Sequence, residues 1–236
     1  MERRDFIKAC AAGAALAASP SAALSAQNAE PRRYAPALLA DELGRPLKAS
    51  ELARGRNYIF HYPYGGTPCF LLDLGRATAA GVALKTADGR AYAWPGGVGP
   101  GRSIVAYSAI CAHQLAYPTK QISFISYRDA GSASPTAKAH MIHCCAEHSE
   151  YDPAQGARVT GGPAEQPLCA ILLEHDAGSD QLRAVGTLGG ELFNRFFEKY
   201  DFRLAIDYGS SKAKAAVSGT TVVSELTQFC KQQVRC

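Results

Sequence analysis

The chain lacks a long uninterrupted hydrophobic run. The Ala/Leu stretch that ends near Ala23 is broken by Pro20, so it makes a poor membrane span, which needs about 20 apolar residues. Runs of basic residues are also missing, and a net charge of +4 is too small to indicate a nucleic-acid partner. The remaining length is enough for one globular domain with its own core.

The beginning of the chain predicts export. Arg3 and Arg4 precede the mildly apolar stretch, and Leu24-Ser25-Ala26 ends in a small residue suited to cleavage. This order is typical of a twin-arginine (Tat) signal over residues 1–26, which carries folded proteins to the periplasm. Two alternatives stay open for membrane association: an uncleaved signal that acts as an anchor, or a membrane-bound partner.

The strongest chemical pattern is a pair of short segments, each with one cysteine and one histidine. The first arm is Cys111-Ala112-His113, and the second arm is Cys145-Ala146-Glu147-His148. Two thiolates and two imidazoles can hold the two irons of an iron–sulfur cluster, and the same donors suit tetrahedral zinc. Structural zinc usually takes separate Cys pairs and His pairs, so the mixed arms favour the cluster.

These arms, together with Gly161-Gly162-Pro163-Ala164, resemble the two cluster-binding loops and the Pro loop of Rieske proteins. The resemblance is dense from residue 111 to residue 168. It implies one Rieske-type 2Fe-2S cluster with Cys111, His113, Cys145 and His148 as ligands. Ser149, Tyr151 and Pro163 would surround it, and hydroxyl hydrogen bonds to the cluster sulfur and a ligand thiolate would raise its potential.

Two departures from the Rieske pattern stand out. In Rieske subunits of cytochrome bc complexes a disulfide joins the two loops, but Ala116 and Glu147 hold those positions here. After the second histidine the family usually reads Gly-Ser-x-Tyr, whereas Ser149-Glu150-Tyr151 follows His148 and is one residue shorter. Packing is therefore expected to hold the loops, and the role of Ser149 is less defined than that of Tyr151.

The chain has eight cysteines. With Cys10 in the signal and two as ligands, the others are Cys69, Cys144, Cys169, Cys230 and Cys236. An odd number cannot pair completely within one chain in an oxidising compartment. We expect Cys230 and Cys236 to close a small loop, or one of them to face a partner.

Short β-prone segments separated by Gly/Pro turns predict a mainly β fold, a Rieske-type antiparallel β-sandwich or barrel. Strands are expected near residues 57–62, 69–74, 81–85, 90–94, 103–108, 121–127, 139–144, 168–174 and 181–185. A helix with an apolar stripe is expected at residues 191–200. The expected organisation begins with a signal at 1–26 and a linker at 27–50, with a short helix near 46–54. A Rieske domain at 51–188 follows, with its cluster-binding part at about 103–168. The chain then ends in a partly helical extension at 189–236. This extension packs on its own domain or docks on a partner subunit.

The resemblance implies one-electron transfer. Rieske oxygenases carry a further mononuclear iron site with two His and a carboxylate, but only His175 follows His148 here. We therefore predict an electron-transfer component of an oxidoreductase with no complete catalytic site of its own. Its redox partner would be a c-type cytochrome or a periplasmic oxidoreductase. Alternatives are the quinol-oxidising Rieske subunit of a cytochrome bc-type complex, and a zinc-stabilised binding module without redox activity.

Overall fold

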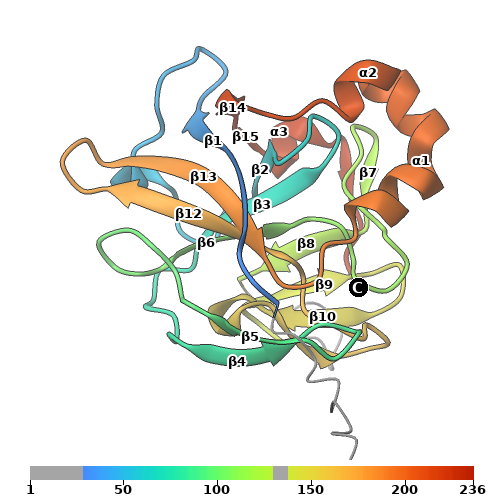
Figure 1. The fold of residues 1–236 in the computed structure, drawn as a ribbon, viewed down its shortest axis with the longest axis horizontal. Coiled ribbons are helices and arrows are strands. Elements are labelled where there is room, and N and C mark those ends of the chain that lie inside the picture. The colour runs from blue at the N-terminus through green and yellow to red at the C-terminus, as the bar shows by residue number, and fades with distance from the viewer. Residues whose placement is uncertain (1–28, 130–137) are drawn as a thin grey trace, which may run out of the picture.

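The computed structural model describes residues 29–129 and 138–236. Within these ranges the protein is mainly β (Figure 1), as the sequence predicts. The predicted export signal lies outside the described residues, and so does most of the excursion between residues 128 and 138. No helix in the described ranges is both long enough and apolar enough to cross a bilayer.

An eight-stranded sheet forms the body of the protein. Its spatial order is β14 (Gly219–Val222), β1 (Arg32–Ala40), β13 (Gln181–Leu188), β12 (Ala170–Asp176), β6 (Ile104–Ser108), β3 (Pro68–Asp73), β2 (Tyr58–His61) and β15 (Ser224–Glu225). Neighbouring strands are antiparallel, apart from β14 beside β1. Five of the predicted strands, β2, β3, β6, β12 and β13, are therefore confirmed within this sheet.

The centre of this sheet is buried on both faces. β3 and β6 are nearly continuous apolar runs, and every residue in both strands is buried. Continuous apolar runs of this length are typical of strands with no solvent-exposed face. The first arm follows β6 after two further buried residues, so it starts from a rigid part of the fold.

A smaller four-stranded sheet carries the second arm. Its order is β11 (Arg158–Gly161), β10 (Ser149–Asp152), β9 (Met141–Cys144) and β8 (Ile125–Arg128). The second arm is the turn between β9 and β10. A separate hairpin, β4 (Val82–Lys85) with β5 (Ala91–Trp94), alternates buried and exposed residues along β4 and so packs through one face.

Three buried clusters hold these parts together. The largest joins one face of the eight-stranded sheet to the small sheet and the β4–β5 hairpin, with Phe70, Trp94 and Tyr151 among its members. A second lies around Phe60 and Leu71. In the third cluster, the first helix packs onto the chain around the first arm. The two arms thus lie close to the boundary between the first and third of these buried clusters.

The segment at residues 27–50 corrects the sequence interpretation. It was expected to be a linker, but β1 lies inside the large sheet between β13 and β14. The short helix expected near residues 46–54 is a single 3-10 turn, η1 (Ala49–Glu51). A second 3-10 turn, η2 (Pro153–Gln155), follows β10.

The C-terminal segment is also part of the body. α1 (Phe193–Tyr208) is longer than the predicted helix and lies beside α2 (Ser210–Ala213) at one side of the molecule (Figure 1). β14 and β15 occupy the two edges of the large sheet, and α3 (Leu226–Phe229) follows β15. Finally, β16 (Gln232–Gln233) pairs with β7 (Ile122–Ser123). The extension therefore packs on its own chain.

Candidate metal centre

The first arm is a tight turn held by its backbone and by α1. The Cys111 N–H donates to the carbonyl of Ala116 at 2.8 Å, and the Leu115 N–H donates to the carbonyl of Cys111 at 3.0 Å. Leu115 has a left-handed backbone, with φ +61°, and its side chain is buried in the cluster under α1. From that helix Lys199 Nζ donates to the carbonyl of Gln114 at 2.7 Å. The helix thus fixes the turn that carries the first thiol and imidazole.

The second arm is a four-residue turn. Cys144 at the end of β9 pairs in register with Ser149 at the start of β10, which leaves residues 145–148 as the connection. Within it His148 has a left-handed backbone, with φ +57°. Gly162 lies against this turn, because a Cβ on Gly162 would come within 2.3 Å of the His148 carbonyl oxygen and 2.6 Å of Ser149 Cα. The predicted Pro loop therefore does touch the second arm, although Pro163 itself is exposed.

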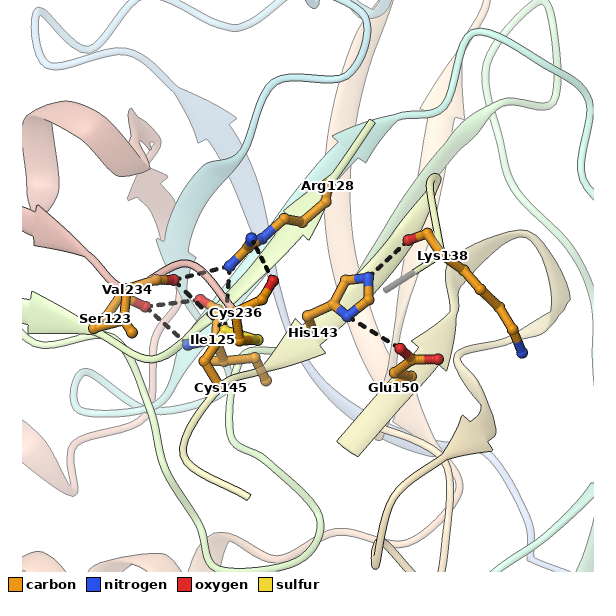
Figure 2. Close-up of a disulfide and its surroundings, with 9 residues drawn as sticks. All are labelled: Ser123, Ile125, Arg128, Lys138, His143, Cys145, Glu150, Val234 and Cys236. Atoms are coloured by element: carbon orange, nitrogen blue, oxygen red, sulfur yellow. Dashed lines mark hydrogen bonds and ion pairs between the residues drawn. A yellow bond between two sulfur atoms is a disulfide. The ribbon is translucent and has the colours of Figure 1, made fainter. Parts of the chain in front are cut away.

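The structure corrects the assignment of Cys145 as a ligand. Cys145 forms a disulfide with Cys236, with their Cα atoms 5.5 Å apart (Figure 2). A disulfide sulfur is not a thiolate and cannot serve as an anionic ligand. The thiol that lies against Cys111 is that of Cys144, and both are completely buried. The expected Cys230–Cys236 bridge is also wrong, because Cys230 is a free thiol.

The two buried thiols shift each other's pKa in opposite directions. The hydrogen bond with Cys144 lowers the pKa of Cys111, against the effect of burial, and a further hydrogen bond from Tyr151 acts in the same direction. The same thiol–thiol bond, together with burial, raises the pKa of Cys144. Cys111 is therefore the sulfur that ionises first. A thiolate is the metal-binding form of cysteine, so the pKa of Cys111 is shifted in the direction that favours a metal ligand.

Tyr151 is aimed at this thiol pair. Its hydroxyl oxygen lies 3.3 Å from Cys111 Sγ and accepts the Ala112 N–H at 3.1 Å. Since the oxygen accepts from Ala112, the hydroxyl hydrogen is free to point to the sulfur. Burial raises the pKa of Tyr151 well above its usual value, which keeps the hydroxyl protonated as a donor.

Two further polar atoms at the arms have no partner. Five buried side-chain nitrogen or oxygen atoms in the described part of the chain make no hydrogen bond, and His113 Nδ1 and Ser149 Oγ are two of them. An unpaired buried polar atom costs about 1–3 kcal/mol, and a bound ion, water or redox group is one of the features that explain such atoms in native proteins. A nitrogen with a free lone pair and a hydroxyl that can donate fit an iron and a sulfide, respectively.

The remaining side chains of the second arm differ from these. Glu147 and His148 are both exposed. The second arm reaches the thiols through its backbone, because the backbone hydrogen bonds of Ala146 and Glu147 to Cys144 lower the pKa of that thiol against the effect of burial. Within the described ranges no group of three or more His, Cys, Asp or Glu side chains could hold a single metal ion.

The disulfide region contains two other features of interest (Figure 2). Arg128 Nη2 lies 3.2 Å from Cys145 Sγ and donates to the carbonyl of Val234 at 2.9 Å. His143 lies 3.5 Å from Glu150 through Nδ1 and 2.8 Å from the carbonyl of Lys138 through Nε2. Both ring nitrogens of His143 therefore have partners, which suits a structural histidine.

Sequence reasoning missed Cys144, although the sequence held a clue to it. If Cys144 is the ligand, the pattern Cys-x-x-x-Gly-Ser-x-Tyr fits without a gap. Ser149 and Tyr151 then take the serine and tyrosine places, and His148 takes the place of the glycine. The left-handed backbone of His148 supports this register, because that conformation favours glycine.

No family model matches the chain. Among solved structures, the chain is similar to the soluble domain of the Rieske protein II (soxF) from Sulfolobus acidocaldarius. The two are 25% identical, and the match covers 67% of this chain and 82% of that chain, with a TM-score of 0.43. A TM-score this low means that the two folds superpose only loosely.

Proposed function

We propose that this chain binds a Rieske-type 2Fe-2S cluster and serves as a one-electron carrier. The observation that carries the proposal is the buried Cys111–Cys144 pair, with the Tyr151 hydroxyl at 3.3 Å from one sulfur. The unpaired His113 Nδ1 and Ser149 Oγ support it from both arms. When bound, such a cluster accepts and releases one electron.

Each of these residues would have one of two roles, as a ligand of the cluster or as a hydrogen-bond donor to it. Cys111 and Cys144 would hold the buried iron as thiolates, and His113 would hold the iron nearer the surface through Nδ1. Tyr151 would donate its hydrogen bond to the Cys111 sulfur, and Ser149 would donate to a cluster sulfide. Donors of this kind stabilise the extra negative charge of the reduced state and so raise the potential.

A zinc-stabilised module is the competing function. Structural zinc usually takes its cysteines and its histidines as separate pairs, whereas each arm here combines cysteine and histidine. The donor arrangement therefore favours a two-iron cluster over a single zinc ion.

The proposed setting is the periplasm, with export in the folded state. The support is the Arg3-Arg4 pair and the small residues before Gln27. There the protein would exchange electrons with a c-type cytochrome or serve as a small subunit of an oxidoreductase. The quinol-oxidising subunit of a cytochrome bc-type complex is the alternative, and the absence of a disulfide between the two arms weighs against it. Replacing both arginines by lysine should leave the protein in the cytoplasmic fraction, and unchanged export would exclude the Tat route.

The test is anaerobic reconstitution followed by iron and sulfide analysis, visible absorption and electron paramagnetic resonance of the reduced protein. Cys111→Ala and Cys144→Ala should each lose the cluster, because each removes a thiolate from the buried iron. The matched control is Cys145→Ala, which should keep the cluster spectrum. Colourless wild-type protein that takes up zinc in place of iron would disprove the proposal.

A further inference from the structure

The Cys145–Cys236 disulfide has no role in the proposed cluster, yet it lies at the surface beside the second arm. Cys145 and Cys236 are each partly exposed, whereas the adjacent Cys144, a proposed ligand, is completely buried in the main core. The disulfide joins the second arm to the end of the chain. A thiol from solvent can therefore meet this bond without reaching the buried ligands.

A pocket of about 430 Å³, lined mainly by polar residues, opens beside the disulfide. Among the described residues that line it are Cys236, Arg128 and Arg235, and Cys145 is not one of them. Burial, and then the charge of Arg235, lower the pKa of Arg128, so the two guanidinium groups lie close enough to repel each other. An anion in the pocket would relieve this repulsion.

The other charged groups of the described lining are already paired. The third arginine, Arg56, lies 3.3 Å from the carboxylate of Glu225. The second carboxylate is that of Asp129, which lies 3.0 Å from Nδ1 of His140. The two arginines beside the disulfide therefore determine the sign of the charge that this pocket prefers. A small ligand with a negative charge fits it best.

Arg128 connects the pocket with the other sulfur of the disulfide. It lines the pocket, and its Nη2 lies 3.2 Å from Cys145 Sγ (Figure 2). When a thiol cleaves a disulfide, one sulfur leaves as a thiolate, and it leaves faster when its negative charge is stabilised. A guanidinium at hydrogen-bond distance provides that stabilisation. The arrangement therefore favours attack on Cys236 and release of Cys145.

We propose that this disulfide is a thiol-exchange site for a small thiol that carries an acidic group. The acidic group binds beside Arg235 and Arg128, and the thiolate sulfur attacks Cys236 Sγ from the pocket. A new bond joins the small thiol to Cys236, the bond between Cys145 and Cys236 breaks, and its electron pair leaves with Cys145 Sγ. The small thiol is oxidised and Cys145 is reduced. The product is a mixed disulfide on Cys236, in which the end of the chain is no longer joined to the second arm.

The experiment measures the second-order rate constant for cleavage of the disulfide in the purified full chain. The anionic probe is 2-mercaptoethanesulfonate and the neutral probe is 2-mercaptoethanol, compared at equal thiolate concentration and at low and high ionic strength. Peptide mass mapping after an acid quench locates the mixed disulfide. The variants are Arg235→Gln and Arg128→Gln. The matched control is Arg33→Gln, which removes the same charge from an exposed position on β1. Far-UV circular dichroism checks that each variant folds.

At low ionic strength the anionic probe should react roughly tenfold faster than the neutral probe. Added salt should reduce this preference, because it screens the arginines. Arg235→Gln should lose most of the preference, whereas Arg128→Gln should also slow the neutral probe, because it removes the charge beside the leaving sulfur. Arg33→Gln should match the wild type. The mixed disulfide should map to Cys236.

Equal rate constants for the two probes in the wild type would overturn the proposal, and so would a disulfide that neither probe cleaves. A preference that Arg235→Gln leaves unchanged would do the same. A mixed disulfide on Cys145 would also overturn it, because the released sulfur would then be that of Cys236. None of these outcomes bears on the proposed cluster, since neither cysteine is among its ligands.

Discussion

At the scale of single residues, the hydroxyl of Tyr151 has the most direct influence on the proposed centre. It accepts a hydrogen bond from the Ala112 N–H and lies 3.3 Å from Cys111 Sγ, to which its own hydrogen is free to point. A donor to a ligand sulfur stabilises the reduced state more than the oxidised state, because reduction adds negative charge. The hydroxyl is therefore expected to tune the potential without being needed for assembly.

Replacing Tyr151 by Phe should keep the cluster and lower its midpoint potential. If the hydrogen bond is stronger by about 1 kcal/mol in the reduced state, the fall is on the order of 40 mV for a one-electron couple. A redox titration measures the shift. The matched control is Tyr107→Phe, because the Tyr107 hydroxyl is also buried but donates to the carbonyl of Pro153 at 2.7 Å. Equal potentials in wild type and Tyr151→Phe would show that this hydroxyl does not act on the cluster.

The adjacent cysteines show what the sequence could and could not reveal about the site. The spacing located both arms and drew attention to Cys111, His113, Ser149 and Tyr151, but Cys144 and Cys145 were a choice between neighbours. Consecutive side chains in a strand point to opposite faces, and Cys144 shares its face with Ile142 in the main core. The spacing of residues in the sequence does not show which of the two cysteine side chains points into the core. Nor does it show the disulfide partner of Cys145, which lies 91 residues away.

At the scale of elements, the C-terminal end of the chain is joined to the second arm by the disulfide and to β7 and β8 by hydrogen bonds. The Val234 N–H donates to the carbonyl of Ser123 at 2.9 Å, and Arg128 Nη2 donates to the carbonyl of Val234 at 2.9 Å. The chain end thus lies beside the small sheet (Figure 1). No disulfide joins the two arms to each other within the described residues. Instead, the second arm is joined to the C-terminal end of the chain.

Replacing Cys236 by Ser should lower the free energy of unfolding by about 2–4 kcal/mol, because a cross-link over so many residues restricts the unfolded chain strongly. Urea unfolding without reductant measures the loss, and reductant should bring the wild type to the same value. Cys230→Ser is the control, since Cys230 is a buried free thiol whose Sγ lies 3.0 Å from the carbonyl of Gln232. A wild type that is insensitive to reductant would contradict the cross-link.

The contact between β2 and α1 gives the fold a dependence on pH. His61 Nε2 lies 3.0 Å from the Tyr208 hydroxyl, and the His61 ring also packs against Phe229 of α3. Burial, and then the charge of Lys120, lower the pKa of His61 to about 4. An unfolded histidine titrates near about 6.5. Protonation therefore favours the unfolded state, so this contribution is complete above about pH 6.5 and is lost as the pH falls toward about 4.

Replacing His61 by Gln should reduce the loss of stability between pH 7 and pH 4.5, because the folded state no longer excludes a proton at this site. The free energy of unfolding, measured at several pH values in that interval, tests the change. His140→Gln serves as control, since His140 is exposed and hydrogen-bonded to Asp129. Identical pH profiles for wild type and His61→Gln would rule out this role of His61.

At the scale of the whole molecule, both ends of the described chain complete one sheet. β1 escaped prediction because it contains Pro36 and begins with two arginines, a composition that suggests a linker. Its pairing with β13 shifts register between Arg33 and Ala37, so the proline lies at an irregularity. The central strands were predictable from their continuous apolar runs. The edge strand β15 has only two residues and β14 begins with a glycine, so neither shows a strand pattern without knowledge of its partner.

Removal of residues 219–236 should abolish cooperative folding. The deletion removes β14 and β15 at the two edges of the large sheet, together with β16 and the disulfide. Val223, Leu226 and Cys230 leave the two main cores with it, and the loss of even one large buried side chain costs about 2–5 kcal/mol. Thermal unfolding followed by circular dichroism tests this, with Cys236→Ser as the variant that removes only the disulfide. If the tail only docked on a partner subunit, the truncated chain would unfold at a temperature close to that of Cys236→Ser. If the tail is part of the sheet, the truncated chain shows no cooperative unfolding transition.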